Sequence, residues 1–161
     1  MLLLKNVLFT LIVPGTVAVW VPMLLTRDRT PVTGPVWPLA MAVLAVGALV
    51  YAWCVWDFAT FGRGTPAPID APTRLVVRGL YRVTRNPMYV GVLSVIVGWA
   101  LVFRSLVLMA YAMAVWCCFQ SFIVFYEEPH LRRVFGAEYR AYCVRVGRWL
   151  PRLGGGSRPS P

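Results

Sequence analysis

The chain has 161 residues, of which 59% are hydrophobic and 14% are charged, and it carries a formal net charge of +10. So apolar a composition excludes a water-soluble globule of this size and indicates an integral membrane protein. The positive charge does not indicate nucleic acid, because the arginines lie between apolar runs, as in proteins oriented by charge in a membrane.

Two apolar runs in the first third of the chain are long enough to span a membrane. The first covers residues 2–25 and lacks a small-residue cleavage site, so we interpret it as a retained anchor rather than a signal peptide. The second covers residues 36–58 and has tryptophans near both ends, where membrane interfaces favour them. Asp57 lies at the inner end of this run, and we expect a solvated helix end there rather than a binding role.

The segment from residue 59 to residue 86 is polar and rich in glycine and proline, with no glycine-rich phosphate loop after a strand. It leads into a stretch at residues 79–91 that brings arginines to the mouth of a third apolar run, where they need water, headgroups or an anionic ligand. Pro87 suits the first turn of a helix, and we expect the side-chain oxygen of Asn86 to cap that helix. Gly91 removes a side chain where another group must come close.

The third run, residues 87–103, is short, about 25 Å of helix. The fourth run covers residues 105–126, and the small polar break between the two predicts a tight hairpin. Gly91, Ser94 and Gly98 share one side of the third run, which indicates either close helix packing or room for a ligand.

Four spans place thirteen of the sixteen lysines and arginines on one side of the membrane. The excess of positive charge on cytoplasmic loops then predicts that both termini are cytoplasmic. The same topology brings Arg85 to the membrane face that carries Glu127 and Glu128.

After the glutamates, Pro129 can open a new helix in which apolar residues recur at three- and four-residue steps. This pattern predicts an amphipathic helix that lies on the inner leaflet or folds over a cavity. His130 is the single histidine, more typical of a surface residue than of a general base, and no cysteine or histidine spacing fits a metal site. We expect one membrane domain over residues 1–153 and a disordered tail over residues 154–161.

Three segments carry a family resemblance. They read G-x-Y-R-x-x-R-N-P-M-Y-x-G at residues 79–91, E-E-x-x-L-x-x-x-F-G-x-E-Y-x-x-Y at residues 127–142, and R-W-L-P at residues 148–151. In this order the chain resembles the isoprenylcysteine carboxyl methyltransferase and phospholipid N-methyltransferase family of integral membrane enzymes. The resemblance implies S-adenosyl-L-methionine as cofactor and a membrane-borne lipid or lipidated acceptor, either an isoprenylcysteine carboxylate, a phospholipid amine or a thiol.

The resemblance also implies the site residues. Catalytic roles fall on Arg85, Asn86 and Glu128. The cofactor would be bound by Tyr81, Arg85, Asn86, Pro87, Tyr89, Gly91, Glu127 and Glu128. The family usually reads Arg-His-Pro where this chain has Asn86. Asparagine donates and accepts hydrogen bonds but carries no proton near neutral pH, which favours a carboxylate or thiolate acceptor over an amine.

We therefore expect an all-α membrane protein with about four transmembrane helices and a C-terminal cytoplasmic amphipathic helix, in a bacterial inner (plasma) membrane. Two other functions are compatible with the sequence. One is an NADPH-dependent enzyme similar to sterol reductases, which show a comparable arginine-then-acidic pattern. The other is a non-catalytic membrane protein whose arginines only hold lipid.

Overall fold

The computed structural model describes residues 2–62 and 74–152, with side chains described from residue 8 onward. All regular elements within these ranges are helices, which confirms the expected fold class. The expected disordered tail and most of the glycine- and proline-rich segment lie outside the described residues.

The first apolar run forms one continuous helical rod. It consists of α1 (Leu2–Gly15), a π-helical turn (Thr16–Trp20) and α2 (Val21–Leu25). A π-helical turn displaces the regular hydrogen-bond ladder and releases carbonyl groups for other partners. Here the hydroxyl of Tyr111 donates a hydrogen bond to the carbonyl of Val17 over 2.9 Å, which ties this rod to a helix far along the chain.

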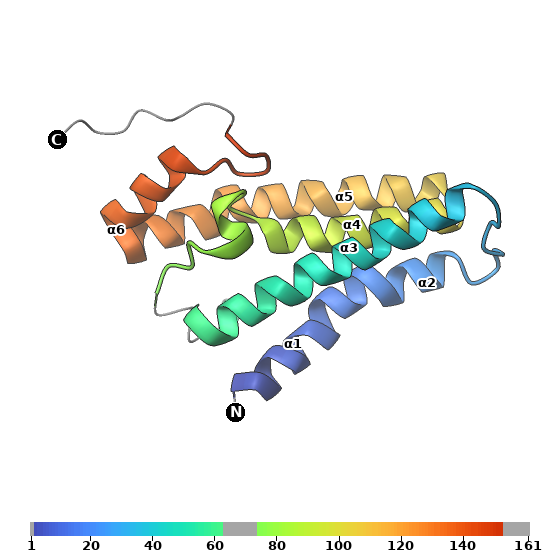
Figure 1. The fold of residues 1–161 in the computed structure, drawn as a ribbon, viewed down its shortest axis with the longest axis horizontal. Coiled ribbons are helices and arrows are strands. Elements are labelled where there is room, and N and C mark those ends of the chain that lie inside the picture. Colours follow the sequence, from blue (N-terminus) through green and yellow to red (C-terminus); the bar gives the residue numbers. More distant parts are fainter. Residues whose placement is uncertain (1, 63–73, 153–161) are drawn as a thin grey trace.

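The second and third runs form α3 (Val36–Asp57) and α4 (Pro87–Val102), which lie side by side in Figure 1. Their contact is close because glycines meet there. A Cβ atom built on Gly91 would lie 2.9 Å from the backbone nitrogen of Tyr51 and 3.0 Å from the carbonyl oxygen of Gly47. Of the two interpretations of the small-residue face, the structure therefore supports close helix packing.

Asp57 differs from its expected state. Its side chain is buried and pairs with Arg78, whose Nε lies 3.2 Å from Oδ1. The expectation of a solvated helix end is therefore wrong. The reason is that the chain returns after α3 and lays Arg78 and the 3₁₀ turn (Gly79–Arg82) over the carboxylate.

The predicted hairpin between the third and fourth runs is confirmed. Arg104 adopts a positive φ of 43° in the connection, and the side chain of Ser105 caps α5 (Leu106–Phe122) by accepting a hydrogen bond from the backbone nitrogen of Leu108.

The fourth run does not end where expected. From α5 the helix continues through a π-helical turn (Ile123–Glu127) directly into α6 (Glu128–Arg145), so Pro129 opens no separate helix. Pro129 has no N–H to donate, but it follows a π-helical turn in which the N–H of Glu128 donates to the carbonyl of Ile123, and the helix passes the proline without a break. The bend falls instead at Gly136, with a φ of 50° that favours glycine.

Three helical stretches are long and apolar enough to cross a membrane, namely Leu8–Leu25, Val36–Phe61 and Leu106–Arg145, and α4 is a shorter apolar helix. Large apolar side chains are exposed on the outside of the rods, such as Leu49 and Leu106, which suits contact with lipid. The start of α1, the end of α3, the start of α4 and α6 lie at the same end of the bundle (Figure 1). The placement of α6 on the membrane surface stays a prediction.

Candidate functional site

A cavity lies at this end of the bundle, between the end of α3, the segment around the start of α4, and the junction of α5 with α6. It holds about 920 Å³ of empty space, part of which is open to the surroundings. The cavity is lined by Phe58, Leu75, Val76, Tyr81, Arg85, Asn86, Tyr89, Phe122, Ile123, Tyr126, Glu127, Glu128, His130, Leu131, Phe135, Tyr139 and Tyr142.

Glu128 gathers three arginines around one carboxylate. Arg148 binds it through two hydrogen bonds, with Nε 2.8 Å from Oε1 and Nη2 3.1 Å from Oε2. Nη1 of Arg85 lies 3.1 Å from Oε1, and Nη2 of Arg132 lies 3.5 Å from Oε2. The two-point contact with Arg148 is the stronger kind of arginine–carboxylate pair.

These partners decide the ionisation of Glu128. Its burial would by itself raise the pKa, but the hydrogen bond from Arg148 and the charges of Arg85, Arg148 and Arg132 lower it below the usual glutamate value. Glu128 is therefore a charged carboxylate whose oxygens are already occupied. Its position makes it an anchor for the arginines of the cavity.

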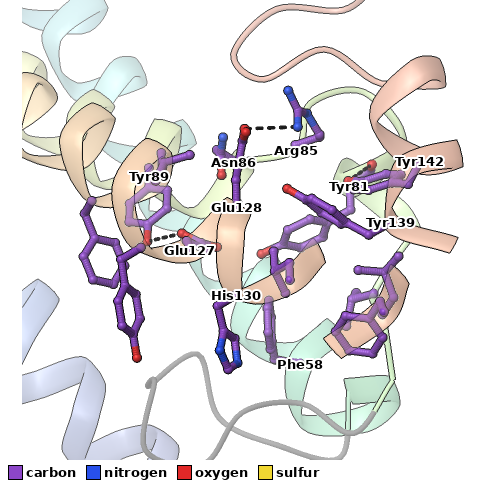
Figure 2. Close-up of a pocket in the computed structure, with 17 residues that line it drawn as sticks. Phe58, Tyr81, Arg85, Asn86, Tyr89, Glu127, Glu128, His130, Tyr139 and Tyr142 are labelled. Atoms are coloured by element: carbon purple, nitrogen blue, oxygen red, sulfur yellow. Dashed lines mark hydrogen bonds and ion pairs between the residues drawn. The ribbon is translucent and has the colours of Figure 1, made fainter. Parts of the chain in front are cut away.

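Glu127 has a different environment, although it is the next residue. Figure 2 shows its carboxylate turned away from that of Glu128 and toward Tyr89, whose hydroxyl donates a hydrogen bond to Oε2 over 2.8 Å. Burial raises the pKa of Glu127, the bond from Tyr89 opposes that rise, and the charge of Glu128 adds to it. Among the described residues no arginine or lysine forms an ion pair with Glu127. A cationic or hydrogen-bond-donating ligand would satisfy this carboxylate.

Arg85 brings positive charge to the same cavity. One nitrogen, Nη1, contacts Glu128 and donates a hydrogen bond to the Sγ of Cys143 over 2.8 Å. Its Nε is buried and has no hydrogen-bond partner among the described residues. Buried donors are nearly always paired in native proteins, so an unpaired one beside a cavity fits an acceptor supplied by a ligand.

The segment that follows α6, residues 146–152, folds back over the start of α4, and we call it the C-terminal strap. Backbone N–H of Arg85 donates to the carbonyl of Gly147 over 2.9 Å. The carbonyl of Arg148 accepts two further hydrogen bonds, from Oγ1 of Thr84 at 2.8 Å and from Nδ2 of Asn86 at 3.1 Å. The strap thereby fixes the arginine stretch from outside.

The expected helix cap by Asn86 is therefore wrong. No side-chain hydrogen bond caps α4, because the Asn86 side chain points to the strap instead. The backbone carbonyl of Asn86 still accepts the first helical bond, from the N–H of Val90 over 3.2 Å.

Six of the eight residues that the resemblance assigned to a cofactor line the cavity, and Pro87 and Gly91 do not. Pro87 is fully buried in the first turn of α4, and Gly91 faces α3. Tyr81 lines the cavity from the 3₁₀ turn and is held by the hydroxyl of Tyr142, which donates to its carbonyl over 2.7 Å.

Sequence reasoning missed two sets of residues. The first is the aromatic lining, which includes Phe58 beyond the end of α3 and Phe122 in α5. Nothing in the linear pattern distinguishes these from lipid-facing aromatics. The second is Arg148, whose role beside Glu128 only the return of the strap reveals, although it belongs to the R-W-L-P motif. His130 does line the cavity, at an exposed position stacked on Tyr126.

In the described part of the chain no three histidine, cysteine, aspartate or glutamate residues come together as a metal site would require. The cavity offers carboxylates, a guanidinium group and aromatic rings. These groups suit an organic ligand that carries both a positive and a negative charge.

Comparison with known proteins agrees with the motifs. The sequence model of the phospholipid methyltransferase family matches residues 37–138. Over 79 residues the chain is 37% identical to a probable protein-S-isoprenylcysteine O-methyltransferase of Oryza sativa (48% of this chain, 41% of the relative). It is 35% identical over 79 residues to protein-S-isoprenylcysteine O-methyltransferase B of Arabidopsis thaliana (48% of this chain, 40% of the relative).

The matched region thus spans about two fifths of the length of these curated relatives. No solved structure matches the chain significantly. The relatives are plant proteins, so the expected bacterial inner membrane and the orientation of the termini stay predictions.

Proposed function

Because this chain belongs to the phospholipid methyltransferase family, we propose that it is an S-adenosyl-L-methionine-dependent methyltransferase acting on a membrane-borne acceptor. One observation supports this most directly. The Glu127 carboxylate and the Arg85 guanidinium share one cavity that is otherwise largely aromatic and apolar, at the end of helices suited to lipid.

The residues fit the proposed cofactor. S-adenosyl-L-methionine supplies an electrophilic methyl group on a sulfonium, and it also carries an ammonium group, ribose hydroxyls and a carboxylate. Glu127 has the free acceptor capacity to take hydrogen bonds from the ammonium or the hydroxyls. Arg85 presents beside the cavity an Nε that has no hydrogen-bond partner in the described part of the chain, and it would hold the carboxylate.

The other polar residues would act by positioning these two. Tyr89 fixes the direction of the Glu127 carboxylate through its hydroxyl. Glu128 holds Arg85 on one side and Arg148 on the other, and Asn86 joins the strap to the start of α4. Methyl transfer depends chiefly on alignment of the nucleophile with the methyl group in a water-poor site, so such a rigid frame would contribute directly to the rate.

We propose a carboxylate or thiolate acceptor with a lipid tail. A carboxylate is already deprotonated near neutral pH, and so is a thiol that is held as its thiolate. An ammonium headgroup, by contrast, must first lose a proton before its nitrogen can attack the methyl group. Asn86 cannot take that proton, and the plant relatives are named as O-methyltransferases. Entry from the lipid would bring the acceptor past Phe122 and Tyr126, which line the cavity and are exposed.

Binding to detergent-purified protein tests the cofactor. Titration calorimetry should show binding of S-adenosyl-L-methionine but not of NADPH, which separates the proposal from a reductase. The substitution Glu127→Gln removes the charge that meets the cofactor and should weaken binding by roughly ten- to a hundredfold. The matched control is Glu138→Gln, in an exposed glutamate of α6 outside the cavity, with unchanged affinity. Equal affinity in both variants contradicts the assignment of Glu127.

A second measurement tests the acceptor. Protein in vesicles receives cofactor with a labelled methyl group, together with either an isoprenylated cysteine or phosphatidylethanolamine. Methyl esters release labelled methanol in mild base, whereas N-methyl groups do not. Label that stays in the lipid fraction after base treatment contradicts a carboxylate acceptor and indicates an amine or a thiol.

A further inference from the structure

A second concave surface lies on α3, on the other side of a wall from the cavity. This groove holds about 1190 Å³ of empty space, much of it open to the surroundings. Asp57 and Leu80 line the groove, whereas their chain neighbours Phe58 and Tyr81 line the cavity. The two spaces therefore share a wall, and the family motifs do not explain the groove.

The apolar part of the groove follows one stripe of α3. Val46, Leu49, Val50 and Trp53 line it and recur at steps of three and four residues, which places them on one side of the helix. From residue 46 to residue 57 this stripe extends over about 16 Å. Because α3 belongs to a stretch long and apolar enough to cross a membrane, the stripe would face acyl chains in a bilayer.

The groove ends at a charged pair. The Asp57 side chain is 1% exposed, and neither of its carboxylate oxygens accepts a hydrogen bond from a described residue. Its cationic partner is Arg78, at 3.2 Å, and the Arg78 guanidinium also lies over the ring of Phe61, with its central carbon 3.2 Å from the ring centroid.

This arrangement fixes an arginine at the membrane interface. A buried carboxylate that accepts no hydrogen bond within residues 2–62 and 74–152 is costly, and the charge of Arg78 beside it offsets part of that cost. The Arg78 side chain is 40% exposed while Asp57 lies behind it, so an approaching headgroup meets the cation. Trp56, which is exposed beside it, is typical of the headgroup level of a bilayer.

We propose that this groove binds one anionic phospholipid, with an acyl chain along the α3 stripe and its phosphate on Arg78. Guanidinium groups bind phosphates tightly, and a pre-positioned arginine loses little conformational freedom on binding. Asp57 balances one positive charge from the buried side, but Arg74 and Arg82 lie exposed on the same segment as Arg78. Their excess positive charge at this face favours a headgroup with net negative charge over a zwitterionic one. This site is separate from the proposed methyl-transfer cavity.

Native mass spectrometry of the full chain tests the site. The protein is extracted from nanodiscs of equal parts phosphatidylglycerol and phosphatidylcholine, and the lipids retained per chain are counted. The wild type should retain one phosphatidylglycerol. Arg78→Gln should reduce that retention about tenfold through loss of a charge-assisted contact. The control Arg82→Gln makes the same charge change at an exposed position outside the groove and should retain the lipid.

A plug gives an independent arm. Ala52→Phe adds bulk to the groove lining while it leaves Arg78 and Asp57 in place, and it should also abolish retention. If Arg78→Gln fails to fold, lipid retention by Ala52→Phe tests the proposal in its place. Equal losses in Arg78→Gln and Arg82→Gln, equal retention of both lipids by the wild type, or full retention in Ala52→Phe would each overturn the proposal. No cofactor is present, so these outcomes do not depend on methyl transfer.

Discussion

The contact between α3 and α4 and the walls of the cavity are held together by opposite means. Between the helices, backbone meets backbone, and a single added methyl group at Gly47 would lie 2.9 Å from atoms of Gly91, Ser94 and Val95. Around the cavity a small number of polar contacts join segments far apart in sequence, and many of them converge on Glu128 and the carbonyl of Arg148.

This difference separates fold from function. The helix contact depends on shape and needs no charge, so it forms the scaffold. The cavity depends on charge and hydrogen bonds that solvent, pH or a ligand can compete for. Substitutions at the first region should therefore lower stability at every pH, whereas the effect of substitutions at the second should depend on pH, on a ligand or on whether the new side chain keeps the hydrogen bond.

The largest effect should come from Gly47→Leu. The new side chain would meet backbone atoms of α4 that cannot move aside, so we expect a loss of about 3 kcal/mol or more in the free energy of unfolding. Monodisperse yield and the thermal unfolding midpoint in detergent measure it. Ala48→Leu is the matched control, because Ala48 is the next residue of α3 and its exposed position should tolerate leucine. Similar behaviour of the two variants would mean that the helices do not pack as described.

Next in size is Glu128→Gln, which leaves three arginines around a neutral amide. We expect the free energy of unfolding to fall by about 3 kcal/mol. This value is at the lower end of the range for breaking a buried ion pair, because Arg148 and Arg132 are partly exposed. Since the pKa of Glu128 is lowered on folding, its stabilisation is present above the usual glutamate pKa and disappears as the pH falls through the lowered value.

The difference in unfolding midpoint between wild type and Glu128→Gln should therefore be large at pH 7. It should shrink as the pH falls below the usual glutamate pKa and close once the pH is below the lowered pKa, where the folded carboxylate also takes up its proton. A difference that stays constant over this range would show that Glu128 acts through packing and not through its charge.

Much of this arrangement follows from the sequence. The four apolar runs gave the helices, because hydrophobic length is a direct requirement of a membrane. Counting arginines placed Arg85 on the same membrane face as the glutamates, and the structure brings Arg85 and Glu128 to 3.1 Å. The motifs found most of the polar cavity lining, because they already bring together the charges that a zwitterionic ligand would need.

The sequence did not reveal the contacts that form where the chain folds back onto an earlier helix. The burial of Asp57 depends on Arg78 returning to the end of α3, and the strap carbonyl of Arg148 draws Asn86 away from its helix. Local rules assign an asparagine before a proline to the cap, because capping is its best local partner. In the structure the Asn86 side chain instead donates to the carbonyl of Arg148, 62 residues away, and no local sequence pattern indicates this hydrogen bond.

Asn86 offers a smaller effect within the same region. Asn86→Ala removes the donor to the Arg148 carbonyl and should cost about 1 kcal/mol, whereas Asn86→His retains a ring N–H for that bond and should be nearly neutral. Thermal unfolding and amide hydrogen exchange at Arg85, whose N–H binds the strap, report the change. Equal losses in both variants would mean that the space at this position matters more than the bond.

The smallest effect, and the sharpest test of the two adjacent glutamates, is the pH dependence of Glu127→Gln. Burial raises the pKa of Glu127 on folding, so the charged carboxylate disfavours the folded state, and stability is lost as the pH rises from the unfolded value to the raised one. A neutral glutamine accepts the Tyr89 hydrogen bond without that penalty. We therefore expect the unfolding midpoint of Glu127→Gln to gain on that of the wild type as the pH rises from 4 to 8. This sign is opposite to that of Glu128→Gln.

A saturating cationic ligand should reverse the sign for Glu127→Gln, because the ion pair between the ligand and Glu127 then favours the charged wild type. If both variants change in the same direction with pH, the two carboxylates do not have the separate roles that their partners indicate.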